Sequence, residues 1–393
     1  MNIGIVTTWF ERGAAYVSRI YEELLEAEGH TVYIFARGGE NIRSALNDKW
    51  SGKNVTRSNK YRDSSIEKKL MNKWIKKNRL EVIFFNEQRD FEIIIWLKKR
   101  YSSIKIGAYV DYYTETSIPK FKVYDFLICN TKRHMQAMKD HPQKFYVKWG
   151  TDVNLYKPVR QGHDLITFFH SVGMSPRKGT DVLIDAFIKG KLYEKSRLVI
   201  HTQIPIEKVT SYTTNDLLKY KNIEIVEKTV TAPGLYYMGD VYVYPTRLDG
   251  LGLTMYEALA SGLPLITSDF PPMNEVGTDE IGKRVKIADY YCRGDAYYYP
   301  MVKCDMQSLI EAMRWYIENP KQLEEQKLMA RAYAEENYDI KKRSKEVADI
   351  FTNAKLRPLD IKLEKEIKKS ILKENELVQK ILNYRNVYEW MRK

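Results

Sequence analysis

The sequence predicts an α/β protein built from two open, parallel-sheet domains. Short β-branched apolar runs alternate with segments of helical periodicity, which is typical of such sheets. This alternation occurs twice, and the irregular chain around 149–163, with Gly150, Pro158 and Gly162, separates the two halves. A chain of 393 residues with 44% hydrophobic and 12% aromatic content can bury two cores and is too apolar for disorder.

The first half opens with a βαβ unit. Asn2–Thr8 is predicted as a buried strand, Tyr16–Glu28 as a helix and Thr31–Ala36 as the next strand. Such a unit implies parallel strands joined by a right-handed crossover. Further strands are predicted at Glu81–Phe85, Ile104–Val110 and Phe126–Asn130. The most apolar runs, Val82–Phe85 and Ile93–Leu97, have the length of buried strands and are too short to span a bilayer.

The second half repeats the alternation. Helices are predicted at Lys178–Ile188 and Leu253–Ala260, and the chain is mostly helical after Met306. The predicted strands are Leu165–His170, Leu198–Thr202, Asn222–Val226, Val241–Tyr244 and Leu265–Thr267. We therefore expect two Rossmann-like domains, 1–158 and 159–338, followed by a helical extension, 339–393. Ligands of such sheets bind beyond the carboxyl ends of the strands, here in a cleft between the halves.

Charge and cysteine content limit the partners and the compartment. The net charge of +13 favours a phosphate-bearing substrate, an acidic membrane or nucleic acid. We expect no nucleic-acid partner, because the basic residues are scattered and form no recognition motif. Three cysteines without a CxxC pair argue against disulfides and structural zinc, and the N-terminus lacks a signal-peptide pattern, so a cytoplasmic location is expected.

The most informative stretch is Tyr244–Ser268, which reads as strand, glycine-rich turn and helix. Gly250 and Gly252 would let backbone N–H groups approach an anion, and the helix that follows points its positive end there. Asp249 and Glu257 stand eight residues apart, and a carboxylate can accept two hydrogen bonds from the diol of a ribose. The pattern suits a nucleotide diphosphate; the alternative is an ordinary turn with solvated carboxylates.

Two other stretches carry candidate phosphate contacts. Gly173 ends a strand, and Arg177 and Lys178 precede a helix, where they could clamp a diphosphate; the alternative is a pair of solvated cations. The Gly13 loop between the first strand and helix could also reach a phosphate, although it is equally a plain turn. The sequence contains no GxxxxGK[ST], GxSxG, HExxH or DxD motif, so we expect no catalytic metal.

Together these stretches resemble the retaining glycosyltransferases of group 1, also called glycosyltransferase family 4, which have the GT-B fold. The resemblance covers residue 2 to about residue 350 and is strongest in Trp149–Pro158, Ser171–Phe187 and Tyr244–Gly262. It implies two Rossmann-like parallel-sheet domains facing a central cleft, with C-terminal helices. It also implies a nucleotide-diphosphate sugar as donor, no cofactor, and a glycan or a lipid-linked molecule as acceptor.

The resemblance assigns a role to each matching residue. Glu257 matches the acidic residue that binds the donor ribose, and Asp249 the one near the donor sugar. Lys178 matches the lysine that neutralises the diphosphate, and Gly13 the glycine loop that faces the phosphates. Further donor contacts are implied for Gly173, Gly250, Leu251, Gly252, Leu253 and Thr254.

Three positions depart from the family pattern. Asp249 replaces a glutamate, and Met174 replaces the usual arginine after Gly173, whose charge Arg177 could supply. The acceptor-side histidine is replaced within Ala108–Asp111, so Asp111 or Tyr109 would occupy its place. The implied reaction is a front-face substitution with retention, in which Lys178, Arg177 and backbone N–H groups stabilise the leaving diphosphate. The alternatives are a non-catalytic nucleotide-sugar or glycan-binding protein and a nucleotide-sugar epimerase.

Three basic or aromatic segments can each be interpreted in two ways. Residues 66–79 predict a basic amphipathic helix containing Trp74, which either packs on the core, the favoured interpretation, or lies on an anionic membrane at the inner face. The tail Lys355–Lys393 is expected to form a crossover helix that packs on the first domain, followed by the extension 360–393, with membrane or partner binding as the alternative. The tyrosines near Cys292–Gly294 are expected in a local core or an oligomer interface rather than stacked on sugars: Tyr290, Tyr291, Tyr297, Tyr298 and Tyr299.

Overall fold

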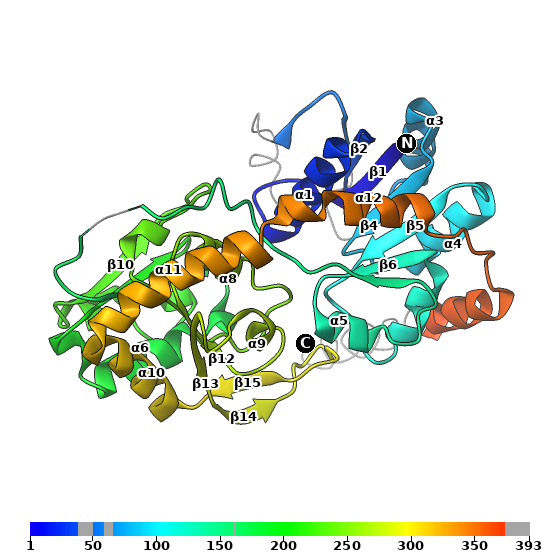
Figure 1. The fold of residues 1–393 in the computed structure, drawn as a ribbon. Helices are drawn as coiled ribbons and strands as arrows, with labels where there is room; N and C mark the ends of the chain where they lie inside the picture. Colours follow the sequence, from blue (N-terminus) through cyan, green and yellow to red (C-terminus); the bar gives the residue numbers. More distant parts are fainter. Residues whose placement is uncertain (38–49, 59–65, 160–161, 374–393) are drawn as a thin grey trace, which may run out of the picture. The chain divides into compact units, whose positions relative to one another are not determined.

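The computed structural model describes residues 1–37, 50–58, 66–159 and 162–373. The chain divides into two compact units, coloured along the sequence in Figure 1. Unit 1 comprises Met1–Cys129, Ala137–Phe145 and Lys345–Lys393; unit 2 comprises Asn130–Gln136 and Tyr146–Ser344. The domain limits of 158 and 338 stay sequence predictions.

Unit 1 is built on a seven-stranded sheet of order β3-β2-β1-β4-β5-β6-β7, with parallel pairing from β3 to β6. The strand order reverses between β1 and β4, where open α/β sheets bind ligands. The strands are β1 (Asn2–Thr8), β2 (Thr31–Arg37), β3 (Val55–Arg57), β4 (Val82–Asn86), β5 (Lys105–Tyr109), β6 (Phe126–Cys129) and β7 (Lys144–Tyr146). All strands predicted in this half are present within a few residues.

The helices of unit 1 bury their apolar faces on this sheet. In α3 (Lys68–Asn78) the buried side chains are Met71, Trp74 and Ile75, and the Trp74 ring lies 5.3 Å from the Phe35 ring in β2. This confirms the core-packing interpretation of the predicted basic helix. The other helices are α1 (Gly13–Ala27), α4 (Phe91–Arg100), η2 (Ile118–Val123), α12 (Ser344–Asn353) and the helical residues 361–373. α5 (Lys132–Ala137) joins the two units.

The apolar run Ile93–Leu97, which is short enough for a buried strand, is helical. This run lies inside α4, which Asp90 caps by accepting hydrogen bonds from the backbone N–H groups of Glu92 and Ile93. Nearly every side chain of the run is buried, so its apolar pattern carries no periodicity that would separate a strand from a helix.

Unit 2 has a six-stranded, wholly parallel sheet of order β10-β9-β8-β11-β12-β13. Its order reverses between β8 and β11, so the loops after these two strands meet at the switch point. The strands are β8 (Thr167–Gly173), β9 (Arg197–Thr202), β10 (Ile223–Glu227), β11 (Val241–Tyr244), β12 (Leu265–Ser268) and β13 (Gly282–Val285).

Helices cover this sheet, and a small hairpin forms a separate two-stranded sheet. The core lies between the sheet, α6 (Thr180–Lys189) and α10 (Met306–Glu318), and includes Phe168, Phe187 and Met313. The hairpin pairs β14 (Ile287–Tyr291) with β15 (Met301–Cys304). The remaining elements are η3 (Pro176–Lys178), η4 (Leu192–Glu194), η5 (Ile206–Lys208), α7 (Thr214–Leu218), η6 (Tyr236–Met238), α8 (Leu253–Ala260), α9 (Met273–Val276), α11 (Pro320–Asn337) and η7 (Ile340–Arg343).

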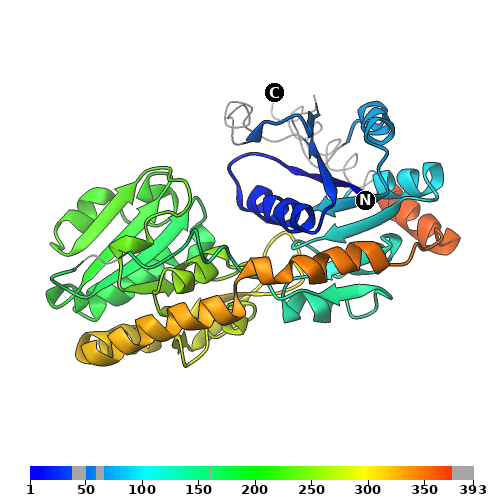
Figure 2. The ribbon, with the colours of Figure 1, turned by 45° about the horizontal axis from the view of Figure 1, so that its top comes forward.

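The last described segment of the chain returns to unit 1. The ring of Phe351 lies 5.0 Å from that of Phe84 in β4, and α12 runs along this part of the sheet in Figure 2. The Lys105 ammonium donates to the carbonyls of Phe351 and Thr352 at 2.6 and 2.8 Å. The tail therefore completes the unit that the N-terminus begins. Residues 374–393, including Val378 and Ile381 of the predicted pattern, lie outside the described residues.

None of the helices in the described part of the chain is both long enough and apolar enough to cross a membrane.

Candidate active site

A turn after β8 carries the predicted diphosphate lysine. Gly173 ends the strand with φ +63°, Ser175 accepts a hydrogen bond from the Arg177 N–H, and the single turn η3 ends at Lys178. Gly179 follows with φ +76°, and a Cβ there would lie 2.0 Å from the carbonyl oxygen of Pro245. Only glycine allows this approach, which presses the turn against the end of β11.

Lys178 meets Asp249 as a result of this approach. Its ammonium forms an ion pair with Asp249 Oδ2 and a hydrogen bond with the Tyr244 hydroxyl, which itself donates to Asp249. The N–H of Gly250 donates to Asp249 Oδ1 at 2.7 Å. Burial alone would raise the pKa of Asp249, but Lys178, Tyr244 and Gly250 outweigh it and lower the pKa to about 2. Asp249 is therefore an anion at neutral pH.

The turn between Asp249 and α8 offers an anion site beside this pair. Gly252 has φ +69°, and α8 starts at the next residue, Leu253. The N–H groups at the start of a helix have no partner within it, and the helix dipole adds positive charge there. Gly250–Thr254 thus forms a turn at the start of α8, and the phosphate binding expected of it stays a prediction.

Glu257 lies on α8 and is held by tyrosines. Tyr236 donates to its Oε2, and Tyr156 also donates to the carboxylate. Burial raises the pKa of Glu257, although these two hydrogen bonds act to lower it. The rings of Tyr236, Tyr242 and Tyr244 follow one another at 5.8 and 5.7 Å. This row of aromatic rings connects Glu257 with the Lys178–Asp249 pair.

Arg133 supports the same loop from a distant part of the sequence. It is 4% exposed, and its guanidinium donates to the carbonyls of Asp249 and Pro271 at 2.5 and 2.8 Å. Sequence reasoning missed Arg133, Tyr236 and Tyr244. No motif marks them, because their role depends on contacts between segments far apart in the chain.

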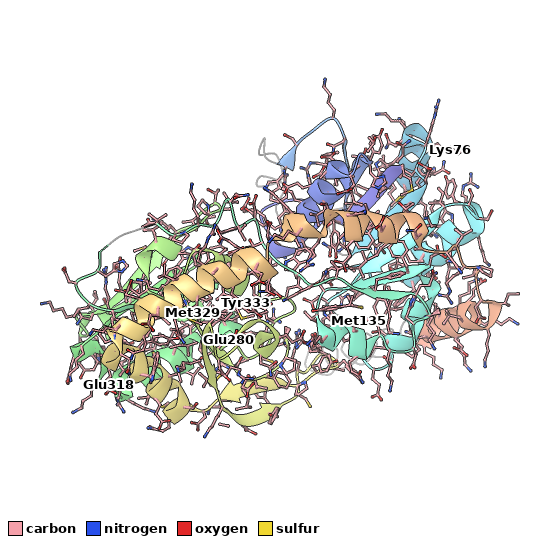
Figure 3. The ribbon with its side chains drawn as sticks, viewed as in Figure 1. Lys76, Met135, Glu280, Glu318, Met329 and Tyr333 are labelled. Atoms are coloured by element: carbon pink, nitrogen blue, oxygen red, sulfur yellow. The ribbon has the colours of Figure 1, made fainter. Side chains whose placement is uncertain are left out.

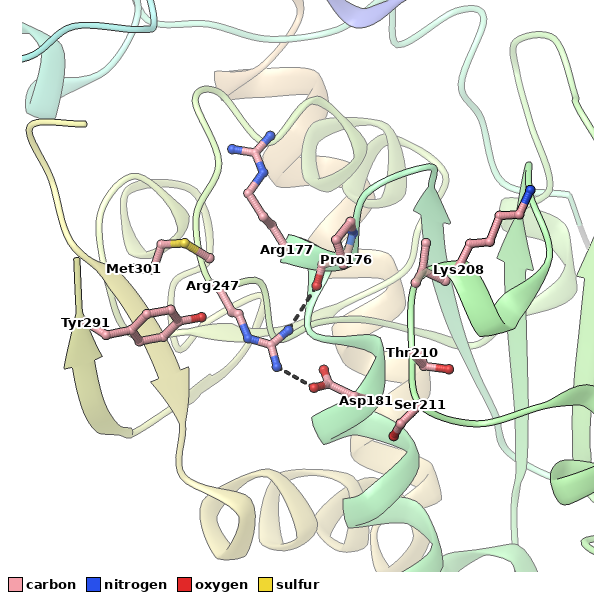
Figure 4. Close-up of a pocket in the computed structure, with 10 residues that line it drawn as sticks. Pro176, Arg177, Asp181, Lys208, Thr210, Ser211, Arg247, Tyr291 and Met301 are labelled. Atoms are coloured by element: carbon pink, nitrogen blue, oxygen red, sulfur yellow. Dashed lines mark hydrogen bonds and ion pairs between the residues drawn. The ribbon is translucent and has the colours of Figure 1, made fainter. Parts of the chain in front are cut away.

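Arg177 and Met174 differ from what the sequence suggested. Arg177 lines a separate pocket with Asp181 and Arg247, shown in Figure 4, and its only described side-chain bond is from Nε to Ser175 Oγ at 3.4 Å. Met174 is 51% exposed. The structure thus brings Lys178 to Asp249 and leaves Arg177 on another wall of the turn.

Two predicted residues belong to unit 1. Gly13 is the first residue of α1 rather than part of a loop. Asp111 follows β5, and its N–H donates to Glu87 Oε1 at 2.8 Å, while Tyr109 is buried at 3% exposure. Glu87 follows β4 with φ +58°, and the Arg37 guanidinium donates to its carbonyl. Burial and the Asp111 charge raise the pKa of Glu87 to about 8.

The tyrosines near Cys292 divide into two groups. Tyr297 is 8% exposed, whereas Tyr290, Tyr291 and Tyr298 are 57%, 39% and 44% exposed. A local core therefore accounts for Tyr297 and leaves these three at the surface of unit 2. Tyr299 is half-buried, and its hydroxyl donates to the Arg133 carbonyl at 2.9 Å. Within the described residues, no group of three or more His, Cys, Asp or Glu side chains could hold a metal ion.

Residues 160–336 match the sequence model of the family described as glycosyl transferases, group 1. This part of the chain is similar to that family, as the sequence patterns predict. The match contains Lys178, Asp249, the glycine turn and Glu257. No curated protein matches the chain by sequence.

Solved glycosyltransferases share the fold of the whole described chain. Sucrose-phosphate synthase from Thermosynechococcus elongatus is 14% identical, with a TM-score of 0.71 over 90% of this chain and 98% of that one. The pneumococcal O-GlcNAc transferase GtfA has 12% identity and a TM-score of 0.66, and Anabaena HepE has 13% and 0.65. Each of these two matches covers 90% of this chain and 99% of the other. At such identities the likeness shows the fold, which is the predicted GT-B fold.

Proposed function

We propose that this chain is a retaining, metal-independent glycosyltransferase of family 4, which transfers a sugar from a nucleotide diphosphate to an acceptor hydroxyl. The observation that carries the proposal is the Lys178–Asp249 pair beside the glycine turn of α8, within a group 1 domain. We further propose that the acceptor is a glycan or a lipid-linked molecule and that the product is a surface glycan or glycolipid.

These residues would assist the departure of the nucleotide diphosphate. As the bond between the anomeric carbon and the diphosphate oxygen breaks, negative charge grows on that oxygen. Lys178 and the N–H groups of Gly250–Thr254 would stabilise this charge. The acceptor oxygen attacks from the same face, and its proton passes to the departing phosphate, so the anomeric configuration is retained.

The two carboxylates would bind the rest of the donor. Asp249 fixes the Lys178 ammonium and is an anion at neutral pH, so it can accept a hydrogen bond from a donor-sugar hydroxyl. Glu257 would accept hydrogen bonds from the ribose diol, and its two tyrosine partners hold the carboxylate in place. In both roles the carboxylate positions the donor and contributes charge, and neither residue acts as a nucleophile.

Nucleotide binding is the first test. GtfA and HepE were each solved in complex with UDP, so UDP leads a series with GDP, ADP and TDP. We expect calorimetry to find one nucleotide that binds, and Glu257→Ala to weaken it by roughly tenfold or more, since a bond to a charged group is lost. Glu318→Ala removes an exposed carboxylate from the same unit and should bind like the wild type. If no nucleotide binds at millimolar concentration, the proposal fails.

Turnover separates the proposal from its alternatives. Proton NMR of sugar released from the preferred α-linked donor should show the α-anomer first, and activity should survive EDTA. Initial appearance of the β-anomer would contradict retention. Nucleotide binding without any turnover would indicate a binding protein, and an epimerised product without acceptor would indicate an epimerase.

A membrane-bound acceptor would favour contact through the outer face of α3. Lys68, Lys69, Lys73, Lys76 and Lys77 are exposed there, and Lys76 is labelled in Figure 3. Because Trp74 is buried in unit 1, such contact would be electrostatic, without aromatic insertion. The protein should float with anionic liposomes at low salt, less so at high salt, and less after Lys68→Glu, Lys69→Glu and Lys73→Glu are combined. No flotation at low salt would exclude this contact.

A further inference from the structure

A second pocket opens on unit 2, on the far wall of the turn that carries Lys178 (Figure 4). It has a volume of about 480 Å³, within the range of roughly 300–1,000 Å³ that small-molecule sites occupy. Four segments form it: η3 with the start of α6, residues 208–211, the loop residue Arg247, and the β14–β15 hairpin. Neither Lys178 nor Asp249 lines it, so it is separate from the candidate donor site.

The charge of the pocket is positive. Three cations line it, Arg177, Lys208 and Arg247, against one carboxylate, Asp181. The carboxylate is already neutralised, because Arg247 donates to Asp181 Oδ2. Among the described residues, neither Arg177 nor Lys208 forms an ion pair. Two cations therefore face the pocket without a countercharge, which favours an anionic ligand.

The frame of the pocket is fixed by hydrogen bonds. Arg247 Nη1 donates to the carbonyl of Pro176 at 3.0 Å, its N–H donates to that of Arg177 at 2.8 Å, and its carbonyl accepts from Val302 at 2.9 Å. Arg247 thus ties η3, α6 and the hairpin together. Thr210 Oγ1 donates to the carbonyl of Ile206 at 3.1 Å, which holds the opposite loop.

The hairpin supplies a wall of different character. Tyr291 and Met301 line it, and the Tyr291 side chain extends toward Arg247 in Figure 4. Tyr291 is 39% exposed, so part of its ring is open to a ligand. An aromatic face can stack on the apolar face of a sugar ring, while cations on the other side hold an acidic substituent.

We propose that this pocket binds an anionic sugar, one that carries a phosphate or a carboxylate, at a site distinct from the donor site. The acid group lies against Arg177 and Lys208, and the ring lies against Tyr291.

Calorimetry with four probes tests the chemistry: glucose 6-phosphate, glucuronate, glucose and inorganic phosphate, with UDP titrated into the same samples. We expect the phosphorylated sugar or the uronate to bind at least about tenfold more tightly than either control, because glucose lacks the charge-assisted contact and phosphate lacks the contact of the ring with Tyr291. If glucose 6-phosphate binds better, the acid group of the natural ligand is a phosphate; if glucuronate binds better, it is a carboxylate. Lys208→Gln and Tyr291→Ala should each weaken that probe by roughly tenfold. Lys221→Gln makes the same charge change just before β10, at the amino end of the strands and away from the pocket beyond their carboxyl ends, and should bind like the wild type.

Each other result overturns the proposal. Phosphate binding as tightly as glucose 6-phosphate would mean an anion site without sugar recognition. Lys208→Gln weakening UDP as much as the probe would assign the pocket to the donor. Nucleotide binding without any probe binding would reject this site and leave the proposed function intact, whereas a wild type that binds none of UDP, GDP, ADP and TDP would reject that function itself.

Discussion

Lys178 and Asp249 hold each other in position, and the lysine keeps the aspartate ionised. The Asp249 carboxylate holds the ammonium between itself and the Tyr244 hydroxyl, and the lysine keeps the pKa of Asp249 at about 2. Each side chain is 20% exposed, so the pair is shielded from water yet open to a ligand. A departing diphosphate would meet a cation already fixed in place, which lowers the cost of reorganisation during the reaction.

Lys178→Gln tests this arrangement at the level of one residue. We expect kcat to fall by about 10²–10³-fold, the loss seen when a group that stabilises leaving charge is removed. Calorimetry with the nucleotide and initial rates with its sugar donor give the two quantities. Lys195→Gln changes an exposed lysine of the same unit and should leave both unchanged. If the substitution weakens nucleotide binding by a similar factor and leaves kcat unchanged, Lys178 only binds the donor.

Glu87 predicts a pH dependence of stability. Its pKa is raised to about 8, by burial first and by the Asp111 charge next. The folded state therefore binds this proton more tightly than the unfolded state, so its stabilising contribution is complete below about pH 4.5 and is lost as the pH rises through 8. Urea unfolding at pH 5, 6.5 and 8 should show a steeper decline for the wild type than for Glu87→Gln. Parallel curves would contradict the raised pKa.

At the scale of the element, the turn between β8 and α6 decides where the cation lies. Gly179 brings this turn against the Pro245 carbonyl, and no other amino acid fits that contact together with a φ of +76°. The position of Lys178 is therefore set by backbone packing, before any side-chain interaction is made.

Gly179→Ala should disturb both stability and activity. The positive φ costs roughly 1–2 kcal/mol for a residue with a Cβ, and displacement of Pro245 adds to that. Gly234→Ala is the matched control, because it has φ +77° in the same unit but meets no atom closer than 3.5 Å. Urea unfolding should show a larger loss for Gly179→Ala, and donor turnover should fall only in that variant. Equal effects would mean that the close contact plays no part.

The sequence predicted elements best where glycines mark their ends. α8 was predicted with its observed ends, because the glycine turn marks its start and Gly262 follows its end. Ile93–Leu97 is buried on nearly all sides, so the cap at Asp90 decides its conformation. The β14–β15 hairpin escaped prediction because its long connection and exposed tyrosines carry no alternating pattern.

The sequence predicted those residues of the site that lie in one continuous stretch of the chain. Asp249, Glu257 and the glycines share one turn and helix, so spacing alone related them. Glu87 could have been suspected, since it follows a predicted strand at its carboxyl end, where such sheets bind ligands. Arg133 could not, because its bond to the Asp249 carbonyl joins residues more than a hundred positions apart.

At the scale of the whole molecule, the returning tail holds unit 1 together. Phe351 is fully buried between Phe84 and Phe126, with ring distances of 5.0 and 5.4 Å. Polar contacts continue along the segment. Asp125 accepts from the Arg357 N–H at 2.8 Å and pairs with Lys98 at 2.7 Å.

Phe351→Ala should therefore weaken unit 1 selectively. Removal of a buried phenylalanine costs about 3–5 kcal/mol. Hydrogen exchange should lose protection in β1, β4 and β5 and keep it in β8 and β11. Leu328→Ala alters a side chain that is 75% exposed and should leave both patterns unchanged. Equal loss of protection in the two units would show that they unfold as one body.

The division of unit 1 into an early and a late segment also orders the events of biosynthesis. Its sheet emerges from the ribosome first, but Phe351 and its neighbours are translated only after the whole of unit 2. At about 5–20 residues per second, the sheet waits roughly 10–40 s for its last helix. The second unit in the sequence can thus mature first, while the nascent first unit exposes an apolar surface that chaperones can bind.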